Sequence, residues 1–185
     1  MRSKIFNVPN TLSLIRVFLA PLVLLFLSLR ITRPISPNYD VSWGDAIAAA
    51  VFIVASLTDA FDGYIARKYK LVTTLGKFID PLADKVLVIA AMLALIELER
   101  LPAWIAMVII TREFVVTGLR LVAAAEGVVI AASKGGKLKT CCQIAALIML
   151  ILKIPGGMAV MWVAMLLTVW SGMDYLIKGS KIITG

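Results

Sequence analysis

The sequence predicts an all-α integral membrane protein, built as one bundle of six transmembrane helices. The first observation is the composition: 61% of the 185 residues are hydrophobic and only 16% are charged, with a mean hydropathy of +0.97, far from the usual soluble balance. The second is that the charges leave six apolar runs near the length that a helix needs to cross a bilayer. Helices are expected because lipid leaves the edges of an open sheet unsatisfied.

The six runs follow one another along the chain and are separated by short connections rich in proline, glycine and polar residues. No hydrophilic segment is long enough for a soluble domain, so residues 1–185 are expected to form a single membrane domain. The connection after the first run, RPISPNYDVSWG, is expected to be a loop. The predicted spans are residues 11–29, 45–67, 75–97, 102–125, 137–153 and 157–177.

The distribution of lysine and arginine predicts the orientation, because basic residues prefer the cytoplasmic side of a membrane. Placing both the N- and C-termini in the cytoplasm puts most basic residues of the connections inside and leaves Arg30, Arg33, Arg100 and Lys153 outside. We therefore expect a multi-pass protein of the cell membrane. The net charge of +8 does not indicate nucleic acid, because the basic residues are dispersed among apolar runs.

Two residue types limit the chemistry. Histidine is absent, which excludes Ser-His, Cys-His and His-metal sites. The two cysteines, Cys141 and Cys142, are adjacent and lack the spacing of a metal site, so they are expected to pack in the core.

Four aspartates interrupt the second and third spans. Asp59 and Asp62 share a stripe of the second span with Gly63 and Ala66, at i, i+3, i+4 and i+7. On the third span Gly76, Asp80 and Asp84 stand at i, i+4 and i+8. The basic turn between the spans folds them into a hairpin, so the two stripes can face each other.

Four carboxylates gathered in a low-dielectric bundle would repel one another unless cations lay among them. Oxygen ligands favour hard ions, so the pattern predicts a pair of Mg²⁺ or Mn²⁺ ions, an arrangement that serves phosphate chemistry. The small residues leave room for a bulky substrate, and Arg67 and Lys77 can offset phosphate charge. The alternative is that the aspartates form ordinary ion pairs with neighbouring arginine and lysine residues.

The spacing D-x-x-D-G-x-x-A-R, followed eight residues later by G-x-x-x-D-x-x-x-D, resembles the signature of the CDP-alcohol phosphatidyltransferases. The likeness implies that Asp59, Asp62, Asp80 and Asp84 bind the metal pair and that Asp84 is also the general base. It implies a site for the cytidine diphosphate lined by Asp59, Gly63, Ala66, Arg67 and Gly76, and it suggests a homodimer.

The segments TREFVVTGLRLVAAAEG and SKGGKLKT resemble those of bacterial phosphatidylglycerophosphate synthases, which transfer phosphatidyl from CDP-diacylglycerol to glycerol 3-phosphate and release CMP. An arginine at membrane depth favours a dianion, such as an acceptor's phosphate. The expected acceptor phosphate site comprises Thr111, Arg112, Arg120, Lys137 and Lys139. The structural alternative is an ion pair of Glu113 with Arg120, beside lysines that extend toward the membrane surface.

Three other functions stay open from the residues. The same chemistry could use another acceptor, such as inositol phosphate. Buried carboxylates also mark cation transporters, and a non-catalytic assembly subunit would tolerate loss of the aspartates. Of these classes the D-x-x-D-G spacing favours the enzyme, with its active site facing the cytoplasm and the lipid bilayer as its surroundings.

Overall fold

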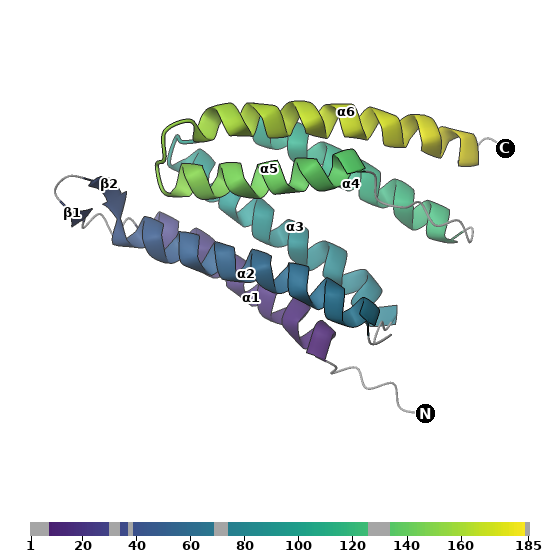
Figure 1. Cartoon of the computed structure of the whole chain (residues 1–185), viewed down its shortest axis with the longest axis horizontal. Coiled ribbons are helices and arrows are strands. Elements are labelled where there is room, and N and C mark those ends of the chain that lie inside the picture. Colours follow the sequence, from purple (N-terminus) through teal and green to yellow (C-terminus); the bar gives the residue numbers. More distant parts are fainter. Residues whose placement is uncertain (1–7, 30–33, 37–38, 69–73, 126–133, 184–185) are drawn as a thin grey trace. The chain divides into compact units, whose positions relative to one another are not determined.

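The computed structural model describes residues 8–29, 34–36, 39–68, 74–125 and 134–183, and within the helices the side chains of residues 8–10, 59–81, 84, 124–125, 134 and 178–183 lie outside the description. The described part contains six helices, so the all-helical prediction is confirmed (Figure 1). They are α1 (Val8–Ser28), α2 (Trp43–Lys68), α3 (Thr74–Glu97), α4 (Ala103–Ala125), α5 (Lys134–Ile151) and α6 (Gly157–Ile183).

The connection between α1 and α2 differs from the expected loop. Strands β1 (Pro34–Ser36) and β2 (Tyr39–Ser42) pair antiparallel there, with Ser36 opposite Tyr39. Ile35, Tyr39 and Val41 favour extended backbone because β-branched and aromatic side chains fit a pleated surface. Apolar periodicity does not reveal a hairpin this short, which explains why the sequence predicts only a loop.

The helices gather into two compact units. The first holds α1, α2, α3 and the hairpin, together with the short segment Ile151–Lys153, and the second holds α4, most of α5, and α6. The prediction of a single domain for residues 1–185 stays a prediction.

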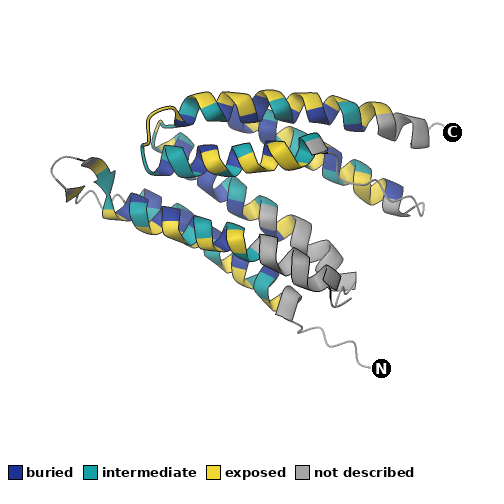
Figure 2. Cartoon of the chain, viewed as in Figure 1, coloured by how far each residue is buried: buried dark blue, intermediate teal, exposed yellow. Residues whose placement is uncertain are grey.

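In the first unit α1 packs against both α2 and α3. Its buried residues recur at helical spacing and form one stripe, whereas Phe18, Leu22 and Leu25 on the other faces are exposed (Figure 2). Small side chains dominate the buried faces of α2 and α3, among them Ala48, Ala55 and Ala91. Small residues let helix backbones approach closely, as is usual in membrane bundles.

An ion-pair network lies at the end of the first unit that carries the hairpin and links the connections there. Ser42 and Asp45 form a capping box at the start of α2: the Asp45 N–H donates to Ser42 Oγ at 3.1 Å, and the Ser42 N–H donates to Asp45 Oδ2 at 3.0 Å. Arg100 Nη1 lies 2.6 Å from Asp45 Oδ1 and donates to the carbonyl of Ile151 at 3.0 Å. Lys153 Nζ lies 3.1 Å from Asp40 Oδ2. Three connections are therefore tied to the first turn of α2.

In the second unit α4 packs against α6, with Ile105, Ile109, Met161 and Ala164 in the core. One face of α6 is exposed (Figure 2), and the residues exposed on it are large and apolar. Large apolar side chains in water are costly, so this face suits lipid. Its exposed residues are Trp162, Val163, Leu166, Val169, Trp170, Met173, Leu176 and Ile177.

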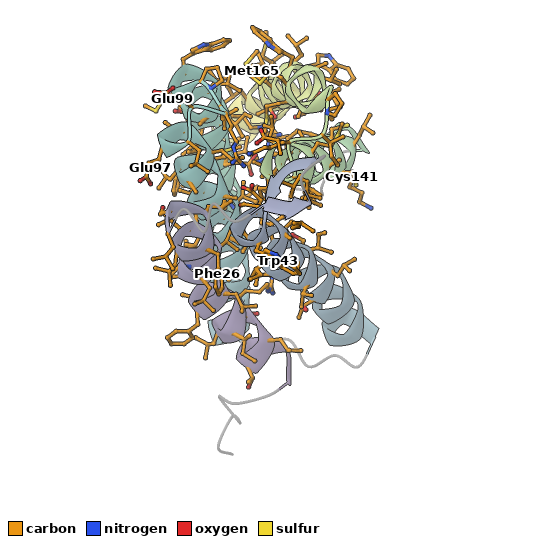
Figure 3. All side chains as sticks on the ribbon, turned by 90° about the vertical axis from the view of Figure 1, so that its left-hand side faces the viewer. Phe26, Trp43, Glu97, Glu99, Cys141 and Met165 are labelled. Carbon is orange, nitrogen blue, oxygen red and sulfur yellow. The ribbon has the colours of Figure 1, made fainter. Side chains whose placement is uncertain are left out.

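The prediction for the cysteines is wrong. Cys141 is exposed and Cys142 is only half-buried (Figure 3). The buried face of α5 carries Lys139, Gln143, Ala146 and Leu147. Since consecutive helical residues are about 100° apart, Cys141 falls on the side opposite that face.

Of the six expected spans, two meet a strict test of length and composition within the described residues. Thr11–Ser28 in α1 and Gly157–Ile177 in α6 are long and apolar enough to cross a bilayer, and Trp43–Thr58 is a shorter apolar helix. The other helices carry charges: α4 contains Arg112, Glu113 and Arg120. The described residues thus support membrane association, whereas the count of six spans and the orientation stay predictions.

Candidate active site

The aspartates lie on two continuous helices of the first unit. Asp59 and Asp62 are on α2, about one turn apart, and Asp80 and Asp84 are one turn apart on α3. The helical spacing that the metal prediction requires is therefore present in the backbone. The side chains of all four lie outside the described residues, as do those of Gly63, Ala66, Arg67, Gly76 and Lys77. Among the side chains that are described, no three acidic or cysteine groups converge as a metal site.

A buried arginine on α1, Arg16, lies at the level along the helices where α3 carries Asp84. Ser28 Oγ donates to Glu97 Oε2 at 3.0 Å, which aligns the ends of α1 and α3 (Figure 1; Glu97 is labelled in Figure 3). Arg16 precedes Ser28 by 12 residues and Asp84 precedes Glu97 by 13, so both stand about 18 to 20 Å from that end. Arg16 is 1% exposed and donates to Ser13 Oγ at 3.3 Å. A cation is thus buried at the level where α3 carries Asp84.

In the second unit two cations share one carboxylate. Lys139 of α5 donates to Glu113 Oε1 of α4, and Arg112 Nη1 lies 3.2 Å from the same oxygen. The side chain of Lys139 is 4% exposed and that of Arg112 13%. Among the described residues, two positive groups thus gather at one carboxylate in a largely desolvated place, which favours an anionic ligand.

Helix α6 completes the surroundings of Arg112. Nη2 donates to Ser171 Oγ at 2.8 Å, and the guanidinium carbon lies 5.7 Å from the centroid of the Tyr175 ring. The Nε–H of Arg112 is buried and meets no acceptor within the described part of the chain. A buried donor without an acceptor costs free energy, so it marks a place where a ligand oxygen would be stabilising.

The structure brings together two of the five residues predicted to bind the acceptor's phosphate, Arg112 and Lys139. Thr111, Arg120 and Lys137 are exposed. Glu113 pairs with Arg112 and Lys139, which replaces the expected structural partner Arg120, and its carbonyl accepts from Thr117 Oγ1 at 2.7 Å. Helical spacing alone suggests Arg120 as the partner of Glu113, whereas the structure places Arg112 and Lys139 there.

Sequence reasoning missed the α6 contribution. Ser171, Gly172 and Tyr175 lie 59 to 63 residues beyond Arg112 in an otherwise apolar helix. The sequence signal for them is the serine followed by glycine within VWSGMDYL, since a buried hydroxyl in an apolar helix needs a hydrogen-bond partner.

Comparison with known proteins finds one family and a set of similar enzymes. The family model described as CDP-alcohol phosphatidyltransferase matches residues 6–170. A Bacillus subtilis protein named CDP-diacylglycerol–glycerol-3-phosphate 3-phosphatidyltransferase is 43% identical over 183 residues, which cover 94% of this chain and 95% of the relative. A Mycobacterium tuberculosis protein named probable phosphatidylglycerophosphate synthase is 40% identical, covering 100% and 87%. An Escherichia coli protein with the same name as the Bacillus one is 38% identical, covering 92% and 93%.

Proposed function

Because the chain belongs to the CDP-alcohol phosphatidyltransferase family, we propose that it transfers the phosphatidyl group from CDP-diacylglycerol to glycerol 3-phosphate, forming phosphatidylglycerophosphate and releasing CMP. The family makes the chain a transferase of phospholipid biosynthesis. The names of relatives at 36–43% identity over most of the chain support these two substrates.

The choice of acceptor rests chiefly on the buried pair of cations, Arg112 and Lys139, around the single carboxylate of Glu113. A phosphate monoester would pair with these cations and could accept from the Nε–H of Arg112. An acceptor without a phosphate, such as serine or free inositol, would leave both needs unmet. Inositol phosphate is the second candidate, because the cluster recognises the phosphate and not the polyol.

The four aspartates are proposed to hold two Mg²⁺ or Mn²⁺ ions. Carboxylate oxygens are the ligands that these ions prefer, and the two described helices carry them at one-turn spacing. When bound, the ions would supply charge stabilisation at the diphosphate. Asp84 is proposed to accept the proton of the acceptor hydroxyl, and Asp59, Gly63, Ala66, Arg67 and Gly76 to line the cytidine diphosphate site.

We further propose a multi-pass protein of the cell membrane whose active site faces the cytoplasm, and which forms a homodimer. The two long apolar helices and the exposed apolar face of α6 support a place in lipid. The excess of basic residues in the connections expected inside supports the orientation.

The test is direct. Purified protein in detergent micelles should release CMP from CDP-diacylglycerol only when a phosphorylated acceptor is added. The rate of CMP release should be higher with glycerol 3-phosphate than with inositol phosphate or serine. Chelation of divalent ions should stop the release, and added Mg²⁺ or Mn²⁺ should restore it. Asp84→Asn should lower turnover by several orders of magnitude.

Two outcomes would contradict the proposal. One is CMP release at an undiminished rate after chelation or in the Asp84→Asn variant. The other is a preference for an unphosphorylated acceptor, which would leave the family chemistry intact but refute the role of Arg112 and Lys139. Exposed Gly118 on α4, converted to alanine, provides a control for handling and folding, because nothing lies within 4 Å of its added methyl group.

A further inference from the structure

The side chain of Arg112 crosses α6 at a glycine. A methyl group added at Gly172 would lie 2.9 Å from Arg112 Cγ, 3.3 Å from Nε and 3.7 Å from Cδ. The nearest of these atoms is close to the base of the arginine side chain, so rotation of its far end alone could not relieve the contact. The observed path of Arg112 therefore requires that residue 172 has no side chain.

Two neighbours of Gly172 hold the guanidinium at the end of that path. Ser171 is 3% exposed and Tyr175 is 5% exposed. Ser171 Oγ donates to the carbonyl of Thr168 at 3.3 Å, so its hydroxyl proton is occupied and a lone pair faces Arg112 Nη2 at 2.8 Å. Tyr175 lies one turn beyond Ser171 and presents its ring to the guanidinium at 5.7 Å. Ser171, Gly172 and Tyr175 thus form one contiguous face of α6, which we call the arginine cradle.

The cradle uses part of the guanidinium and leaves part of it available. Nη1 is directed to Glu113 and Nη2 to Ser171. The Nε–H is buried and has no acceptor among the described residues. An arginine that served only to neutralise Glu113 would gain little from this arrangement, because Glu113 already pairs with Lys139.

We propose that the arginine cradle is a positioning element for the acceptor: it fixes Arg112 so that its Nε–H and the adjoining guanidinium edge meet the phosphate of glycerol 3-phosphate. This rests on the proposed function. Gly172 and Ser171 act through Arg112 and are positioning residues, whereas Arg112 is the group that contacts the substrate. Pre-organisation of the guanidinium lowers the entropy that binding would otherwise cost.

The experiment compares steady-state kinetics of CMP release for the purified full chain, with glycerol 3-phosphate and CDP-diacylglycerol varied separately. Gly172→Ala should raise KM for glycerol 3-phosphate about tenfold or more, since one charge-assisted hydrogen bond is lost or misplaced. KM for CDP-diacylglycerol should change less than about twofold. Ser171→Ala should raise the acceptor KM by a smaller factor, and Ser171→Thr, which keeps the hydroxyl, should restore it.

Gly118→Ala on α4 is the matched control, because it makes the same change at a helical glycine with open space around it. Its KM values should equal those of the unsubstituted protein. If Gly172→Ala does not fold, the Ser171→Ala and Ser171→Thr pair decides, since both changes leave residue 172 intact.

The proposal is overturned if Gly172→Ala or Ser171→Ala lowers turnover while leaving the acceptor KM unchanged, or if both substrates are affected alike, because either result indicates a purely structural role. Failure of the unsubstituted protein to use glycerol 3-phosphate at all would instead refute the proposed function, and the cradle's role with it.

Discussion

Replacing Lys139 by methionine is expected to impair use of the phosphorylated acceptor far more than use of the lipid donor. The side chain of Lys139 is 4% exposed and donates to Glu113, which Arg112 Nη1 also approaches at 3.2 Å. Methionine keeps much of the length of the side chain and removes its charge. Loss of one charge-assisted hydrogen bond to the acceptor costs about 1.5 to 3 kcal/mol, which corresponds to about a 10- to 150-fold fall in kcat/KM for glycerol 3-phosphate.

The double variant Lys139→Met, Glu113→Gln separates binding from charge balance. Lys139→Met alone removes one of the two cations that the described residues place against Glu113, so the free energy of unfolding should fall by about 1 to 3 kcal/mol. Adding Glu113→Gln removes the carboxylate that has lost a partner and should return part of that stability. The kcat/KM for glycerol 3-phosphate should stay low, because the ammonium that binds the phosphate is still missing.

Both quantities can be measured on the same preparation. Thermal unfolding in detergent, followed by tryptophan fluorescence, reports stability, and initial rates of CMP release with each substrate varied in turn report binding. Full recovery of acceptor use in the double variant would refute the reasoning, since it would mean that Lys139 only neutralises Glu113. An equal effect of Lys139→Met on both substrates would refute it as well.

The remaining predictions concern stability. Asp45→Asn should lower the free energy of unfolding by about 2 kcal/mol, because Arg100 loses its charged partner at 2.6 Å; a melting temperature within about 1 °C of the unsubstituted protein would contradict this. Glu99→Gly should raise the free energy of unfolding by about 0.5 to 1 kcal/mol, since Glu99 lies two residues beyond the end of α3 at a φ of 57° that glycine adopts without strain, and a lower melting temperature would count against it. Arg16→Leu should lower the free energy of unfolding by about 1 to 3 kcal/mol, because the buried Ser13 hydroxyl loses the donor that lies 3.3 Å away; thermal unfolding that matches the unsubstituted protein would argue that Arg16 is not needed there.

Most of the fold was accessible from the sequence because its determinants are local. Long apolar runs specify helices in lipid, and breaker residues mark where they end. The predicted spans agree with the observed helices to within a few residues at most ends. The β1–β2 hairpin was missed because four or fewer residues in each strand carry too little periodicity. The exposed Cys141 was misjudged because the sequence does not state which face of α5 is covered.

The aspartates and the Arg112–Lys139 cluster differ in how far the sequence alone describes them. The spacing of Asp59, Asp62, Asp80 and Asp84 is a property of single helices, and the observed helices preserve it. The five residues expected to bind the acceptor's phosphate stay a prediction. The sequence does not state which of them are buried together: Arg112 and Lys139 meet at Glu113, whereas Thr111, Arg120 and Lys137 are exposed.

Patterns along the chain were enough to establish that it is helical and apolar, that its acidic residues recur at helical spacing, and that it resembles one enzyme family. The pairing of Glu113 with Lys139 and Arg112, and the contacts of Ser171, Gly172 and Tyr175 with the guanidinium, became known from the packing of the helices. The two kinds of information differ in the sequence separation of the interacting residues. Helix formation and spacing depend on neighbours within a few residues, whereas the partners of a buried charge come from whichever distant helix packs against it.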